Sequence, residues 1–280
     1  MEVRIIKIKH TIWIIFMISL FLILFIIVDA RKDKSTEIIF GGVEGAVIKT
    51  DTAVPVVQEE STVSDEPDLD WPDIDITEHQ YSMVCDSMLL SAVYYPEVSE
   101  IDAAYVTYYG SKFDTETMPY LIAMLDAVRE AGYSIYVNSG YRSYSYQEQI
   151  FNGTAYGIAE AMGVTDYMDP EYQVAVEKAR KVTNYPGASE HQLGLAVDLV
   201  DRYRGTLKYS NMDQEMFAWL DEHCFEYGFI KRYPTKKLLL TGWDESYHYR
   251  YVGVEAATFI MKNDLSYEQF YAHYDPTFTY

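Results

Sequence analysis

An aspartate interrupts an otherwise apolar run, Leu195–Val200, well inside the chain. A short run of this kind predicts a strand that is buried on both faces. Asp198 would be buried with it, and a buried carboxylate is costly unless a strong partner replaces the lost water. A metal ion is such a partner. This one position therefore constrains both the fold around it and the chemistry that the chain can support.

Two histidines and a glutamate complete a metal-binding set with Asp198. His191 precedes the aspartate, and Glu245 and His248 follow it in the stretch Glu-Ser-Tyr-His. A catalytic zinc takes three protein ligands and keeps a fourth position open. His191, Asp198 and His248 can supply the three ligands, and Glu245 can then accept a proton from the catalytic water.

The spacing between the first two ligands predicts a turn. His191 and Asp198 are seven residues apart, which on a uniform strand would place them on opposite faces. Gly194 lies between them and tolerates the turn or bulge that would bring both side chains to one metal.

The second pair also diverges on a plain strand, because Glu245 and His248 are three residues apart. We therefore expect Glu245 in the loop after Gly242 and His248 at the start of a strand, Tyr247–Val252. Two alternatives remain open: Asp244 as the base, and a hydrogen-bonded cluster that holds no metal.

Three ordered motifs resemble those of the VanY-like D-alanyl-D-alanine carboxypeptidases, zinc peptidases that trim peptidoglycan stems. They are Ser-Gly-Tyr-Arg-Ser at 139–143, Ser-Glu-His-Gln-Leu-Gly-Leu-Ala-Val-Asp at 189–198, and Glu-x-x-His at 245–248 before Arg-Tyr-Val-Gly. The resemblance extends from about Met88 to about Tyr271. The family usually has Pro-Trp inside Glu-x-x-His, where this chain has Ser246 and Tyr247. This departure leaves the chemistry intact and bears on the shape of the substrate pocket.

The resemblance implies roles for the residues that match. It makes His191, Asp198 and His248 the zinc ligands and Glu245 the catalytic base. It also makes Arg142 the group that holds the terminal carboxylate of the substrate, although a structural ion pair is the other interpretation of this arginine.

Two further polar residues are candidates for substrate binding. Ser189 either caps a turn or forms a hydrogen bond with substrate. Gln147, a little over one helical turn beyond Arg142, either lines the pocket or faces solvent.

The resemblance thus implies a zinc-dependent carboxypeptidase that removes the terminal D-alanine from peptidoglycan stem peptides. Rival activities are those of an L,D-carboxypeptidase, a D,D-dipeptidase or an endopeptidase. A zinc-stabilised cell-wall binding module without activity, or an envelope interaction protein with a structural metal, belongs to another class. Glu245 argues against both, because a structural site has no use for an unliganded carboxylate beside an open metal position.

The charge and the cysteine count narrow the classes of partner and of scaffold. A net charge of −21 argues against nucleic acid, whose phosphates need a basic surface. Two cysteines, Cys85 and Cys224, do not make a disulfide scaffold, and two unrelated thiols are favoured over a single bridge. We expect a monomer.

The first 30 residues predict a cytoplasmic tail and a transmembrane anchor. Thr11–Val28 carries no charge and is long enough to span hydrocarbon. A cleaved signal peptide ending near Ala30 is the rival interpretation, but the apolar run is longer than a usual signal core. Basic residues are balanced on the two sides of the span, so the charge does not settle its orientation. The resemblance implies a single-pass protein of the cell membrane whose catalytic domain is extracellular.

Residues 31–78 predict an acidic, disordered tether, because their composition cannot bury enough apolar surface to order itself. The catalytic domain is expected at 79–280. Its helical and strand-like segments alternate irregularly, which indicates an α+β fold with a small, mostly antiparallel sheet flanked by helices. Leu89–Val93 and Leu238–Leu240 are among the expected strands.

Overall fold

The computed structural model describes residues 69–280, which form one compact unit, Leu69–Tyr280. The predicted membrane anchor and residues 31–68 of the predicted tether lie outside these residues. Within the part that is described, no helix has the length and apolar character needed to cross a membrane.

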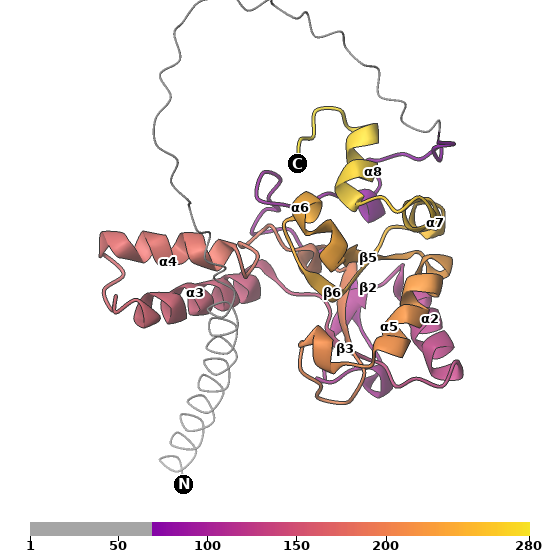
Figure 1. The fold of residues 1–280 in the computed structure, drawn as a ribbon, viewed down its shortest axis with the longest axis horizontal. Helices are drawn as coiled ribbons and strands as arrows, with labels where there is room; N and C mark the ends of the chain where they lie inside the picture. The colour runs from indigo at the N-terminus through magenta and orange to yellow at the C-terminus, as the bar shows by residue number, and fades with distance from the viewer. Residues whose placement is uncertain (1–68) are drawn as a thin grey trace, which may run out of the picture. The chain divides into compact units, whose positions relative to one another are not determined.

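The centre of the domain is a four-stranded antiparallel sheet with strand order β3-β4-β6-β5 (Figure 1). The strands are β3 (Tyr136–Ser139), β4 (Ala196–Val200), β5 (Phe229–Tyr233) and β6 (Glu245–Tyr251). A second sheet pairs β1 (Val98–Glu100) with β2 (Lys112–Asp114). The α+β class with small antiparallel sheets is confirmed. The strand predicted around Asp198 is β4, and every residue in it is buried.

Two helices cover one face of the four-stranded sheet. They are α2 (Met118–Glu130) and α5 (Gln214–His223), and their buried positions follow the helical period, as at Leu121, Met124, Leu125 and Val128. Val197, Tyr249 and Tyr251 of the sheet belong to the same core cluster. Because side chains alternate along a strand, Asp198, His248 and Arg250 point to the opposite face. The functional residues therefore lie on the face that the α2–α5 core leaves free.

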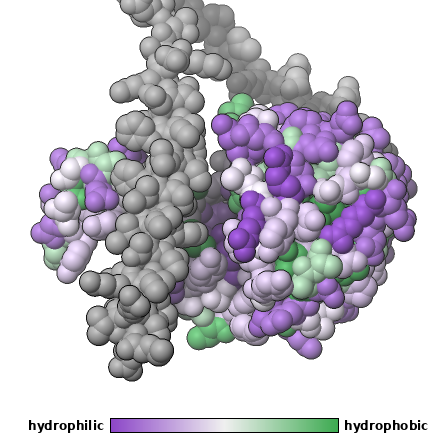
Figure 2. All heavy atoms as spheres, turned by 90° about the horizontal axis from the view of Figure 1, so that it is seen from below, coloured by the Kyte–Doolittle hydropathy of each residue, from purple (hydrophilic) through white to green (hydrophobic). Residues whose placement is uncertain are grey.

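An antiparallel pair of helices projects from this body (Figure 1). They are α3 (Tyr144–Ala161) and α4 (Pro170–Arg180), each capped at its N-terminus by a side chain, from Ser143 and Asp169. The pair has small apolar clusters of its own, with Phe151 and Ala179 in one and Ala159 and Ala175 in the other. Figure 2 shows a mostly hydrophilic surface on the face in view, with hydrophobic residues in small patches.

The C-terminal helices hold the beginning of the described chain. The helices are α7 (Val254–Lys262) and α8 (Tyr267–Tyr274). Trp71 stacks on His273 with ring centroids 3.7 Å apart, and the hydroxyl of Tyr274 donates to the carbonyl of Pro72 at 2.6 Å. Residues 69–78 thus pack with the domain, although the sequence predicted a tether as far as residue 78. The acidic composition of this segment concealed one half-buried aromatic anchor, Trp71.

Two expected strands are wrong. Leu238–Leu240 begins the short helix α6 (Leu238–Thr241), whose leucines are exposed, and Leu89–Val93 is irregular, with a turn at its end and no strand. Cys85 and Cys224 are both free thiols, as favoured from the sequence. The remaining elements are short 3₁₀ turns: η1 (His79–Tyr81), η2 (Ala103–Tyr105), η3 (Glu190–Leu193), η4 (Tyr209–Asn211), η5 (Cys224–Tyr227) and η6 (Thr235–Lys237).

Gly140 lets β2 approach the chain just after β3. A Cβ atom at this position would lie 2.3 Å from the carbonyl oxygen of Lys112, which is a backbone atom and cannot swing away. The same lysine carbonyl accepts a hydrogen bond from the amide of Tyr141 at 2.7 Å. The close approach therefore needs glycine.

We expect Gly140→Ala to destabilise the domain by about 1–3 kcal/mol, the usual cost of overpacking. Gly157→Ala is the matched control, because nothing lies within 4 Å of a Cβ at that position in α3. Alanine there should be neutral or stabilise the helix by up to about 1 kcal/mol. Thermal unfolding of both variants measures the difference. Equal melting temperatures would contradict the close-approach argument.

Candidate metal centre

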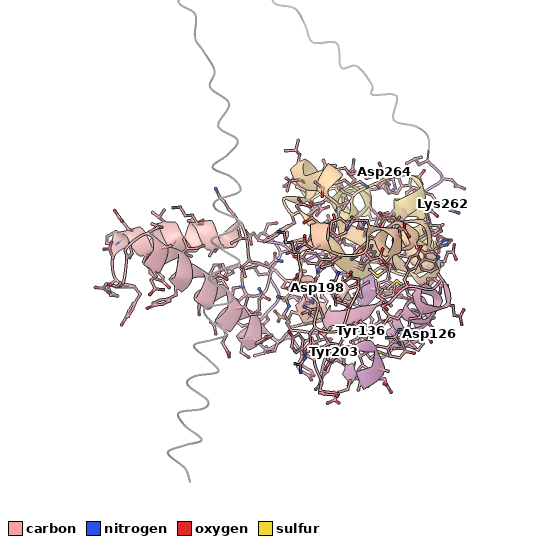
Figure 3. All side chains as sticks on the ribbon, turned by 60° about the horizontal axis from the view of Figure 1, so that its bottom comes forward. Asp126, Tyr136, Asp198, Tyr203, Lys262 and Asp264 are labelled. Atoms are coloured by element: carbon pink, nitrogen blue, oxygen red, sulfur yellow. The ribbon has the colours of Figure 1, made fainter. Side chains whose placement is uncertain are left out.

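The register of the central sheet brings Asp198 and His248 together. Asp198 of β4 lies directly opposite His248 of β6. The Nδ1 atom of His248 is 3.0 Å from Oδ1 of Asp198, and both side chains are buried. In Figure 3, Asp198 lies toward the side of the body from which α3 and α4 extend, away from the labelled Lys262 and Asp264.

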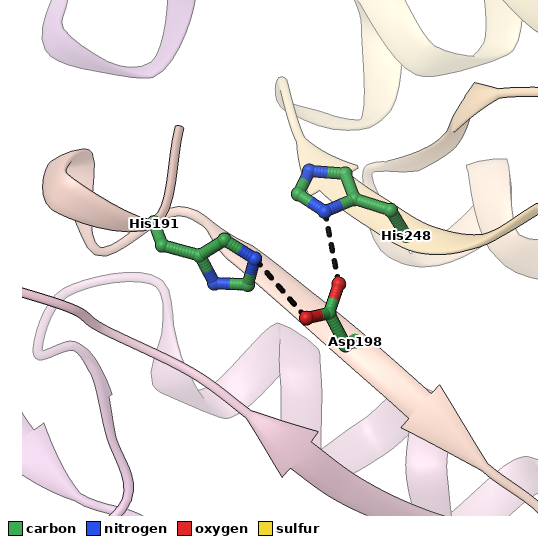
Figure 4. A group of neighbouring side chains, drawn as sticks. All are labelled: His191, Asp198 and His248. Atoms are coloured by element: carbon green, nitrogen blue, oxygen red, sulfur yellow. Dashed lines mark hydrogen bonds and ion pairs between the residues drawn. The ribbon is translucent and has the colours of Figure 1, made fainter. Parts of the chain in front are cut away.

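His191 reaches the same carboxylate from a turn and not from the strand. It lies in η3, which ends at Gly194 in a left-handed conformation with φ of 78°. A Cβ at Gly194 would also lie 2.9 Å from Cγ1 of Val98, so both geometry and space favour glycine. The predicted turn is confirmed. It places Nε2 of His191 3.3 Å from Oδ2 of Asp198 (Figure 4).

The hydrogen bonds of the two histidines leave one nitrogen of each facing the shared space. Nδ1 of His191 lies 2.7 Å from the carbonyl oxygen of Gly140, which only accepts, so Nδ1 carries the proton. Nε2 of His191 is then a buried acceptor without a hydrogen-bond partner. His248 has Glu190 at Nε2, with Oε2 at 3.2 Å, and directs Nδ1 toward Asp198.

These three residues fit a metal ion. One ligand atom from each of His191, Asp198 and His248 lies within 4.8 Å of the others. Two imidazoles and a carboxylate are a donor set that zinc accepts, and the unpartnered Nε2 of His191 is the kind of atom that a bound ion would satisfy. The fit rests on the donor chemistry and on this orphaned nitrogen.

The two histidines differ in their affinity for protons. Burial and the nearby Arg142 guanidinium lower the pKa of His191 to about 4. Burial also opposes protonation of His248, but hydrogen bonds to Asp198 and Glu190 outweigh it and raise the pKa to about 9. Burial disfavours the ionised form of Asp198, yet the two imidazoles hold its pKa well below the usual range.

Arg142 lies beside this centre. Its backbone amide donates to the carbonyl of His191 at 3.0 Å, and its Nη2 atom is 3.9 Å from Oδ2 of Asp198. Nη1 donates to Oε1 of Gln147 at 3.0 Å, and Gln147 in turn donates from Nε2 to the carbonyl of Asn184 at 2.7 Å. Gln147 is therefore buried and orients the guanidinium, so it does not face solvent. Ser189 is buried too, and its hydroxyl has no partner.

Glu245 is the first residue of β6, opposite Tyr233, so its expected place in a loop is wrong. Lys231 and Tyr233 on β5 are two residues apart, while their partners Tyr249 and Glu245 are four apart. This irregularity in the pairing frees Glu245 and His248 from the strict alternation that separates residues three apart.

The surroundings of Glu245 favour it over its neighbour as a base. Burial raises its pKa, an effect that Asp198 reinforces and that the charges of His248 and Arg142 oppose. Asp244 is exposed instead, and its Oδ1 accepts a hydrogen bond from Thr235 at 2.7 Å.

Four buried charged residues behind His248 were missed from the sequence: Glu190, Arg232, Arg250 and Glu268. Oε1 of Glu190 accepts from Nε of Arg232 at 2.8 Å, and Arg232 also donates to Oε1 of Glu268 at 2.6 Å. A signal was present for Arg250, which lies between Tyr249 and Tyr251, so the argument that singled out Asp198 applies to it as well. Arg232 directly follows Lys231, and the sequence there gives no such signal.

Known proteins match the part of the chain that contains this site. The family model of the VanY D-alanyl-D-alanine carboxypeptidases matches residues 110–254. A D-alanyl-D-alanine carboxypeptidase of Enterococcus faecalis is 39% identical over 165 residues, which cover 58% of this chain and 56% of that protein. The chain spans about half the length of the curated relatives it matches.

Two solved structures share the fold. A mutant of the vancomycin resistance D,D-pentapeptidase VanY in complex with Zn(II) is 34% identical, with a TM-score of 0.57. The alignment covers 69% of this chain and 99% of that one. The LdcB LD-carboxypeptidase is 28% identical, also with a TM-score of 0.57, over 72% of this chain and 92% of its own.

The pKa values of the two histidines predict how many protons metal binding releases. At about pH 6 the metal-free protein holds a proton on His248, whose pKa is about 9, and none on the acceptor nitrogen of His191, whose pKa is about 4. A ligand nitrogen must be deprotonated, so zinc should displace about one proton. Calorimetric titration with zinc in buffers of different ionisation enthalpy measures this number. Release of two protons, or of none, would contradict the assignment.

Proposed function

Because the chain belongs to the family of VanY D-alanyl-D-alanine carboxypeptidases, we propose that it is a zinc-dependent carboxypeptidase that removes the terminal D-alanine from peptidoglycan stem peptides. The observation that carries this proposal is the convergence of His191, Asp198 and His248 beside Arg142, with Glu245 close by. This arrangement combines a metal-binding set, a base and a group that recognises a carboxylate.

His191, Asp198 and His248 would hold the metal through Nε2, a carboxylate oxygen and Nδ1. Bound zinc supplies a Lewis acid that polarises the scissile carbonyl and lowers the pKa of water, from about 16 to about 7 in well-known sites. The sheet and the η3 turn hold these atoms in place, and their burial excludes bulk water from the site.

Glu245 serves as the base. It removes a proton from the attacking water, whose oxygen bonds to the carbonyl carbon of the scissile peptide. The carbon–nitrogen bond then breaks, and the same proton passes from Glu245 to the leaving amine of D-alanine. The raised pKa of Glu245 suits this double role, because a more basic carboxylate takes up a proton more readily.

Arg142 binds the free carboxylate at the end of the substrate. A guanidinium binds a carboxylate with two parallel hydrogen bonds, and Nε of Arg142 is a buried donor without a partner. Gln147 fixes one side of the guanidinium, which leaves the other donors for the ligand. The unpartnered hydroxyl of Ser189 is a further donor for the substrate backbone.

An L,D-carboxypeptidase is the second candidate, and the fold shared with the LdcB LD-carboxypeptidase favours it. Incubation of the purified chain with synthetic pentapeptide and tetrapeptide stems, followed by mass spectrometry, separates the two. A D,D-enzyme shortens the pentapeptide by one residue, whereas an L,D-enzyme shortens the tetrapeptide.

Glu245→Gln should fold and bind zinc but lose turnover, because the amide cannot accept the proton. Loss of a general base typically costs ~10²–10⁴-fold in rate. Asp244→Asn is the matched control, since it removes the neighbouring exposed carboxylate, and its rate should stay near wild type. Stem hydrolysis and zinc content are measured for both. A fast Glu245→Gln variant with a slow Asp244→Asn variant would transfer the role to Asp244.

Arg142→Ala should lower kcat/KM on stems with a free C-terminus by about ten- to hundredfold, as expected for a charged hydrogen bond of about 1.5–3 kcal/mol. Amidation of the substrate C-terminus should cause a similar loss in the wild-type enzyme. The two losses should not add, because they remove the same contact. Equal cleavage of free and amidated stems would identify an endopeptidase and make Arg142 a structural residue.

A further inference from the structure

The far side of His248 contacts a carboxylate that belongs to none of the roles above. Nε2 of His248 is 3.2 Å from Oε2 of Glu190, the residue that precedes His191 in the η3 turn. Glu190 is buried, and a buried carboxylate needs partners. Glu190 therefore directly precedes one of the two histidines in sequence and lies behind the other in space.

The two oxygens of Glu190 have different partners. Oε1 accepts from Nε of Arg232 at 2.8 Å and lies 3.4 Å from Nη1 of Arg250. Oε2 faces His248. Two buried guanidiniums, one from β5 and one from β6, therefore clamp one oxygen and aim the other at the imidazole.

Glu190 is not required to keep these arginines paired. Arg232 also donates to Glu268 of α8 at 2.6 Å. Arg250 donates from Nη2 to the backbone carbonyls of Gln80 and Ser82, at 3.0 and 3.1 Å. Each arginine thus keeps at least one partner without Glu190, whereas Nε2 of His248 has no other partner among the described residues.

We propose that Glu190 is a positioning residue that selects the tautomer of His248. An ionised carboxylate only accepts hydrogen bonds, so the His248 nitrogen that faces it must carry a proton. Asp198 faces Nδ1 in the same way, so the metal-free imidazole carries both protons. When His248 gives up one proton to bind a metal, Glu190 retains the proton on Nε2, and the lone pair falls on Nδ1, the atom directed toward Asp198 and the space shared with His191. Glu190 thereby presents the correct nitrogen to the metal. This role rests on the zinc centre of the proposed function.

Glu190→Gln tests this with almost no change in shape. The carbonyl oxygen of the amide should turn to the two guanidiniums, which need an acceptor, so its NH2 group faces His248. Nε2 must then accept, the proton moves to Nδ1, and the ring can no longer offer Nδ1 as a ligand. We expect zinc affinity to fall about 10–100-fold, as for other residues that orient a metal-binding histidine.

Glu268→Gln is the matched control. It makes the same substitution on another buried partner of Arg232, but Glu268 does not touch His248. Its carbonyl oxygen can keep the hydrogen bond from Arg232, so zinc affinity should stay within about twofold of wild type. A loss confined to Glu190→Gln separates tautomer selection from a general weakening of the buried charges.

Two measurements on the purified full-length chain decide the proposal. Competition with a chelator gives the zinc affinity of each variant. Long-range ¹H–¹⁵N NMR of the zinc-loaded proteins reports which ring nitrogen of His248 carries the proton. Wild type and Glu268→Gln should show the proton on Nε2, and Glu190→Gln should lose that pattern. Glu190→Asp keeps a carboxylate, so His248 should carry the Nε2 proton in this variant. It also provides a second test of the proposal if Glu190→Gln does not fold.

The proposal fails if Glu190→Gln binds zinc as tightly as wild type, or if His248 keeps its Nε2 proton in that variant. It also fails if Glu190→Asp folds without the Nε2 proton. Neither measurement depends on hydrolysis. A chain that shows these metal and NMR results but cleaves no stem would overturn the proposed activity and leave the role of Glu190 intact.

Discussion

The buried carboxylate of Asp198 is the constraint on which the site depends. A carboxylate in the middle of a four-stranded sheet loses its water, and that loss is costly unless charged or hydrogen-bonding groups replace it. His248 meets it across the β4–β6 pairing, and His191 meets it from the turn before β4. Of the three side chains, His191 keeps one buried nitrogen, Nε2, without a hydrogen-bond partner, and a bound metal would satisfy it.

The rest of the domain holds these groups in register. Glycine at 140 lets β2 approach, and the carbonyl of Gly140 orients His191. Behind His248, Arg232 reaches Glu268 of α8, and Arg250 reaches the carbonyls of the η1 segment. The C-terminal helix and the start of the domain are therefore tied to the same charged network as the site. Removing one member of this network would leave a buried charged partner unpaired, so site geometry and domain stability are coupled.

The candidate site was more predictable from the sequence than the fold around it. Asp198 is conspicuous because it breaks an apolar run, and the turn at Gly194 follows from the distance to His191. The strand predicted at Leu238–Leu240 was wrong because a run of three leucines is equally compatible with a strand and with a short helix. Trp71 was hidden within acidic residues, since a single aromatic anchor has no periodicity.

The sequence by itself determined the residue types that meet and the local turns that let them do so. Side-chain chemistry and backbone permissiveness are properties of each residue, so they can be read without coordinates. Only the tertiary structure decided that Glu245 lies on β6 beside an irregular strand pairing, and that Nε2 of His248 forms its hydrogen bond with Glu190 and not with solvent. The first depends on the register between β5 and β6, and the second on a contact between residues more than fifty positions apart. The packing of the whole sheet sets both, and no local pattern encodes them.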